Sequence, residues 1–114
     1  MQRLDILKES GVIDSEIYTY TLAVLKYLDK EIPFLDEERV AVFLTHLAMA
    51  AARENSGNPI DAMEPFIKEE IINDSTFPRA KDLWQKLEKI SPIKFSETEI
   101  DYCYVHICSM LKEE

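Results

Sequence analysis

The hydrophobic positions of this chain recur with helical spacing in six segments, separated by short stretches of glycine, proline and polar residues. Apolar residues at positions i, i+3, i+4 and i+7 form the buried face of an amphipathic helix. The pattern predicts helices over about 2–10, 15–30, 36–55, 63–73, 78–90 and 96–112, with only 92–95 extended. We therefore expect an all-α fold, a compact bundle of five to six helices with short connections.

Residues typical of helix ends support these boundaries. Gly11 and Gly57 stand where a left-handed residue commonly ends a helix. Asp36 is a plausible N-cap, and Ser96 with Glu99 forms the Ser-x-x-Glu pattern of a capping box. Prolines then interrupt or begin helices at Pro33, Pro59, Pro65, Pro78 and Pro92.

The segment 36–55 is apolar almost all round from Val40 to Ala52, which is typical of a helix at the centre of a bundle. In the two helices that follow it, the periodicity predicts inward-facing apolar side chains. These are Phe66, Ile67 and Ile71 in the first and Leu83, Trp84, Leu87 and Ile90 in the second.

Length and charge narrow the possible functions. A chain of 114 residues is expected to form a single helical domain over 1–114. Its net charge of -9 disfavours direct binding to nucleic acid or to an anionic membrane. The apolar runs are too short for a membrane span, and the first residues lack the apolar core of a signal peptide. The protein is therefore expected in the cytoplasm.

The chain has none of the common enzyme motifs, such as a glycine-rich phosphate loop, a nucleophile elbow or His-Glu-x-x-His. Its two cysteines, Cys103 and Cys108, would lie about 140° apart around one helix, so they are expected as buried free thiols. Cys103 and His106 would give a metal only two ligands, fewer than zinc requires. We expect no enzymatic activity, no cofactor and no metal.

The first of the two histidines, His46, lies within an apolar helix. Residues three, four and seven positions away share its face, and this stripe includes Arg39 and Arg53, each about two turns from the imidazole. The two guanidinium groups could hold an anion beside the ring. The alternative is a core histidine that bonds to a neighbour, with both arginines solvated.

The second histidine, His106, shares its face with Glu99, Tyr102 and Cys103. A carboxylate near an imidazole would favour its protonated form or fix its tautomer. Glu99 is equally explained as the capping-box residue, and it could serve in both ways.

The two histidine segments together resemble the PTS-regulation domain, the helical module of sugar-responsive bacterial antiterminators and activators. The resemblance covers about residues 15–112. The first matching segment is Leu44–Leu47, followed by small apolar residues and Arg53. The second is Phe77-Pro78 with Ala80 and Trp84, and the third is Glu99-Ile100 with Tyr104–Ile107. The spacing of 60 residues between the two histidines also matches the family. Two departures are Thr45, where the family often has an acidic residue, and the segment Ser96–Glu99, where it is richer in proline and aspartate.

The resemblance implies a regulatory domain of the sugar phosphotransferase system, acting in transcription regulation and usually paired as a homodimer. It makes His46 and His106 candidate phosphoacceptors, with Arg53 and Arg39 supporting the first and Glu99 orienting the second. The implied partners are phosphocarrier or sugar-permease proteins and an output regulator, because such regulators normally carry a separate nucleic-acid-binding domain.

Two other interpretations remain at this point. The chain could be a structural or protein-interaction helical module with buried, unreactive histidines. It could also be a small-molecule or metal-binding enzyme domain, which would need a deep polar pocket with more convergent ligands than the sequence offers.

Overall fold

The computed structural model describes residues 1–112 and folds into six α-helices, with no strand in that part of the chain. The helices are α1 (Gln2–Glu9), α2 (Ser15–Glu31), α3 (Glu37–Ser56), α4 (Pro65–Ile72), α5 (Phe77–Lys89) and α6 (Glu97–Leu111). The predicted all-α helical bundle is confirmed, and each predicted helix is present with boundaries that shift by at most two residues. The segment 92–95 is a loop.

The helix ends form as the capping residues predict. The side chain of Asp36 accepts a hydrogen bond from the Arg39 backbone N–H, and Asp14 does the same for the start of α2. Gly57 ends α3 in the left-handed conformation, with φ of 71°, which a residue without Cβ adopts at no steric cost. These local contacts fix where α2 and α3 begin and where α3 ends.

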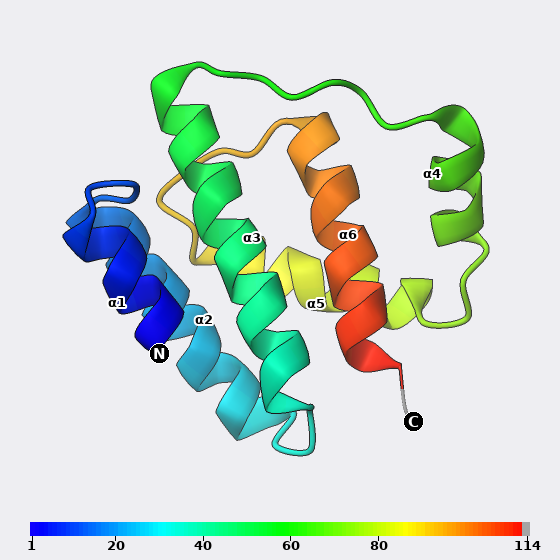
Figure 1. Ribbon diagram of the computed structural model, residues 1–114. Helices are drawn as coiled ribbons and strands as arrows, with labels where there is room; N and C mark the ends of the chain where they lie inside the picture. Colours follow the sequence, from blue (N-terminus) through cyan, green and yellow to red (C-terminus); the bar gives the residue numbers. More distant parts are fainter. Residues whose placement is uncertain (113–114) are drawn as a thin grey trace.

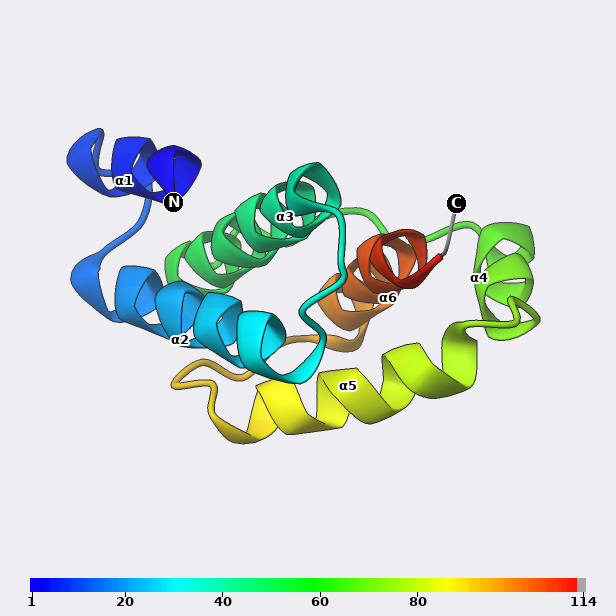
Figure 2. The same cartoon turned by 90° about the horizontal axis from the view of Figure 1, so that it is seen from below.

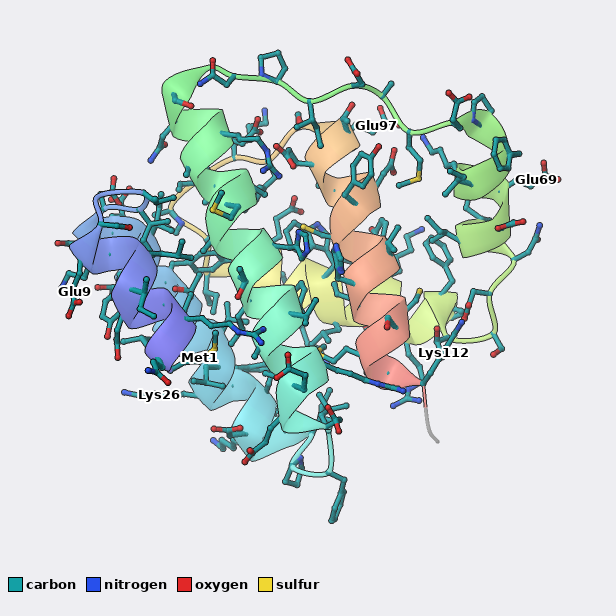
Figure 3. The ribbon with its side chains drawn as sticks, viewed as in Figure 1. Met1, Glu9, Lys26, Glu69, Glu97 and Lys112 are labelled. Atoms are coloured by element: carbon teal, nitrogen blue, oxygen red, sulfur yellow. The ribbon has the colours of Figure 1, made fainter. Side chains whose placement is uncertain are left out.

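Helices α3 and α6 lie side by side and run in opposite directions at the centre of the bundle (Figure 1). Seen from below, α2 and α5 pack on one side of this pair, while α1 and α4 stand at its two outer edges (Figure 2). The outer face of α3 and α6 between α1 and α4 is therefore left uncovered by other helices.

One hydrophobic core joins α1, α2, α3, α5 and α6. Phe43, Leu44 and Leu47 of α3 are fully buried in it, which confirms the central place predicted for this helix. The hydroxyl of Tyr20 donates to the Leu87 carbonyl, at 2.9 Å, and so joins α2 to α5 inside the core.

Two apolar positions predicted to face inward are exposed. Phe66 of α4 is 62% exposed and Ile90, just after α5, is 50% exposed. Helix α4 has eight residues and packs mainly on α6, so only the stripe that includes Ile71 reaches the core. Ile90 is the C-terminal cap of α5, where the chain already turns away from the helix axis.

The end of α6 is held by α3 and by the loop before α5. Arg39 donates to the backbone carbonyls of Ser109 and Lys112, and the ammonium of Lys112 lies 2.8 Å from a carboxylate oxygen of Asp74. Hydrogen bonds from Lys112 and Thr76 lower the pKa of Asp74 to about 2. These contacts fix the position of α6 along α3.

Candidate functional site

The polar residues singled out from the sequence form one stripe between α3 and α6. On α3, Arg39, His46 and Arg53 follow one another at intervals of seven residues, close to two helical turns, so they lie on one face. On α6, Glu99 and His106 have the same spacing. Because the helices are antiparallel, His46 lies opposite His106 and Arg53 lies opposite Glu99.

The two histidine rings stack face to face. Their centroids are 3.8 Å apart and their planes are inclined by 14°. This distance is the contact distance of two flat rings, so nothing separates them. His46 is exposed and His106 is half-buried, which leaves ring edges within reach of solvent. Residues 60 positions apart in the sequence thus form a single pair.

Both imidazoles are held in the neutral form at neutral pH. Partial burial lowers the pKa of His46, and the positive charge of Arg53 lowers it further. Burial lowers the pKa of His106 from 6.5 to about 4, with a smaller contribution from His46. A neutral imidazole keeps one unprotonated nitrogen whose lone pair can act as a nucleophile or a hydrogen-bond acceptor.

Arg53 and Glu99 form a two-bond ion pair beside the histidines. The Nε of Arg53 donates to one carboxylate oxygen of Glu99 at 2.8 Å, and one terminal nitrogen donates to the other oxygen at 2.9 Å. The Glu99 side chain is 2% exposed and that of Arg53 is 30% exposed. A planar guanidinium matches a carboxylate in this geometry, so the pair fixes α3 and α6 to each other.

Glu99 therefore does not act on His106 as the sequence suggested. Its carboxylate faces Arg53, and the pKa of His106 is lowered instead of raised. The capping box forms only in part, since Ser96 accepts from the Glu99 backbone N–H, whereas Glu54 of α3 accepts from the Ser96 backbone N–H. A residue from another helix has taken the reciprocal role, which leaves the Glu99 carboxylate available for Arg53.

The expected anion cradle of Arg39 and Arg53 around His46 is not formed in this conformation. The guanidinium of Arg53 binds Glu99, and that of Arg39 donates to the carbonyls at the end of α6. The hydroxyl of Thr45 donates to the Ala41 carbonyl of its own helix. The arginines thus fix the position of α6 on either side of the histidine pair.

The other chemically active residues near the pair are shielded. Both cysteines are free and buried, as expected, and burial raises the pKa of Cys103 to about 12.

Within residues 1–112, no three His, Cys, Asp or Glu side chains are grouped so that they could hold a metal ion. The same part of the chain contains no helix long and apolar enough to cross a bilayer.

The PRD domain family model matches residues 16–109, a span that contains both histidines, Arg53 and Glu99. This chain belongs to the PRD domain family. The resemblance inferred from the sequence is thereby confirmed, and the chain is a regulatory domain of a family controlled by the sugar phosphotransferase system. PRD domains are regulatory rather than catalytic modules.

A relative in Escherichia coli (strain K12), the uncharacterized protein YhfY, is 26% identical over 106 residues. The match covers 92% of this chain and 88% of that protein, so the two are similar over nearly their whole lengths. No solved structure matches this PRD domain.

Sequence reasoning found each member of this site but not which residues pair. It treated His46 and His106 as separate sites and placed Glu99 with His106, because only contacts within one helix can be read from spacing. One signal was present: the seven-residue step from His46 to Arg53 equals the step from Glu99 to His106. In two antiparallel helices, equal steps bring both pairs into register at once.

We expect the stacked pair to be visible in a pH titration followed by NMR. In wild type the His106 imidazole should titrate near pH 4, below its usual value of 6.5. The unfolded chain then binds the proton more tightly, so the fold loses stability as pH falls from 6.5 toward 4. In His46→Ala, hydration of the uncovered ring should raise the pKa of His106 by about one unit. Titration of His106 near 6.5 in wild type would mean that the rings are apart in solution.

Proposed function

We propose that this PRD domain is switched by phosphorylation of the His46–His106 pair, with the phosphoryl group supplied by a phosphocarrier or sugar-permease protein of the phosphotransferase system. The observation that supports this most is the stacking of two neutral imidazoles, 3.8 Å apart, at the surface of α3 and α6. A donor protein of that system would place the domain in the cytoplasm.

The transfer needs only groups that the pair and the donor carry. The unprotonated nitrogen of a neutral ring attacks the phosphorus of a donor phosphohistidine, and the new P–N bond forms as the donor P–N bond breaks. The donor phosphohistidine carries a proton on its other ring nitrogen, so its imidazole keeps the electron pair of the broken bond and leaves as a neutral ring. The acceptor ring likewise keeps its N–H, so no further reactant is required.

The expected output is a change in association. A phosphoryl group adds nearly two negative charges at neutral pH. On the uncovered face of α3 and α6, these charges would alter any contact that a second copy or an output regulator makes with that face. Transcription regulation would follow through such a partner, because the chain, at -9, is repelled by nucleic acid.

The proposal is tested by incubating the pure protein with phosphoenolpyruvate, the general phosphotransfer enzyme and its phosphocarrier protein. Intact-mass analysis should show an acid-labile phosphoryl group on wild type and none on the double variant His46→Ala/His106→Ala. Sedimentation of both forms measures association before and after modification. If wild type stays unmodified while the donors phosphorylate a control protein, the domain is a helical interaction module without this switch.

A further inference from the structure

The stacking of the two histidines limits how many phosphoryl groups they can carry. A phosphoryl group on a ring nitrogen has its phosphorus in the ring plane and its oxygens above and below that plane. The neighbouring ring lies only 3.8 Å away and nearly parallel, at 14°. One such group can lie beside a flat unmodified ring, but two on adjacent edges would need the same space.

Charge opposes a second group on any edge of the pair. Two phosphoryl groups would place close to four negative charges within the width of two stacked rings. Arg53, whose positive charge acts on His46, already forms two hydrogen bonds with Glu99. Arg39 is likewise engaged with the carbonyls at the end of α6. Arg53 thus already balances the charge of Glu99, and the carboxylate of Glu54 adds further negative charge near Arg53.

A single phosphoryl group does not meet these obstacles. The unmodified neighbour is neutral and keeps one N–H that can donate a hydrogen bond. Each ring has an edge within reach of solvent, since His46 is exposed and His106 is half-buried. Neither histidine is thus excluded as the first acceptor.

We infer that the His46–His106 pair holds one phosphoryl group at a time, on either ring, so that phosphorylation of one histidine blocks the other. This rests on the proposed function only in naming the natural donor. The two histidines then act as one switch with two states, and two donor proteins compete for it instead of adding their signals.

The test uses potassium phosphoramidate, a small phosphoryl donor that needs no recognition by the protein. Native wild type should stop at one phosphoryl group by intact mass, with the second addition slower by roughly a hundredfold or more. The single variants His46→Gln and His106→Gln should each accept one group. Wild type unfolded in urea is the matched control and should accept two, because its rings are no longer stacked.

The inference is overturned if native wild type reaches two groups at a rate close to that of the first. It is equally overturned if native wild type accepts none, or if only one of the two single variants is modified. These outcomes do not depend on the phosphotransfer proteins. A failure of the proposed function would appear separately, as no transfer from the phosphocarrier protein to any form of the chain.

Discussion

Replacing Arg53 by methionine should destabilise the fold by about 3 kcal/mol, because the Glu99 carboxylate would remain buried without its partner. The side chain of Glu99 is 2% exposed, and the Arg53 guanidinium satisfies both of its oxygens. Chemical denaturation followed by circular dichroism measures the loss. Since the pair joins α3 to α6 next to the histidines, the same variant should disturb the His46–His106 stack.

Two further variants separate the buried charge from general effects of substitution. Arg3→Met removes an arginine from the exposed pair with Glu38, and it should cost less than about 1 kcal/mol. The double variant Arg53→Met/Glu99→Leu removes both charges and should recover most of the stability lost in the single variant. Equal losses in Arg3→Met and Arg53→Met would contradict the burial of the Arg53–Glu99 pair.

The second large effect is expected in the hydrophobic core, at a buried side chain of α3. Phe43→Ala should destabilise the fold by about 3–5 kcal/mol, because Phe43 is fully buried and its removal leaves a cavity between packed helices. Phe34→Ala is the matched control. Phe34 is 96% exposed, so the same change there should alter the free energy of unfolding by about 0.5 kcal/mol or less.

Thermal unfolding of the two phenylalanine variants measures this difference directly. We expect a lower transition temperature for Phe43→Ala and an almost unchanged one for Phe34→Ala. A comparable decrease in both variants would mean that the loop carrying Phe34 packs against another part of the chain or a second copy in solution.

The helices were predictable because their signals are local. Asp36 caps α3 through a backbone N–H three residues away, and Gly57 ends the helix through its own backbone conformation. The apolar run from Val40 to Ala52 requires burial on most sides, whatever its neighbours are. Such features depend on residues within one or two turns, all of which the sequence presents together.

The predictions of buried side chains were wrong where burial depends on how far a neighbouring helix extends. Phe66 and Ile90 match the apolar periodicity of their helices, yet both are exposed. Periodicity identifies the apolar face of a helix but not the length of that face that another helix covers. For α4, which packs mainly on α6, the covered part is short.

The sequence by itself determined six helices, the central place of α3 and the residues that form the polar stripe, since each follows from spacing within one segment. Only the tertiary structure decided that His46 stacks on His106 and that Arg53 binds the Glu99 carboxylate instead of an external anion beside His46. These pairings depend on the direction and register of α3 against α6. That register is set by contacts between residues far apart in the sequence: Arg53 and Glu99 are separated by 46 positions, and His46 and His106 by 60. The hydrophobic periodicity of a single helix carries no information about it.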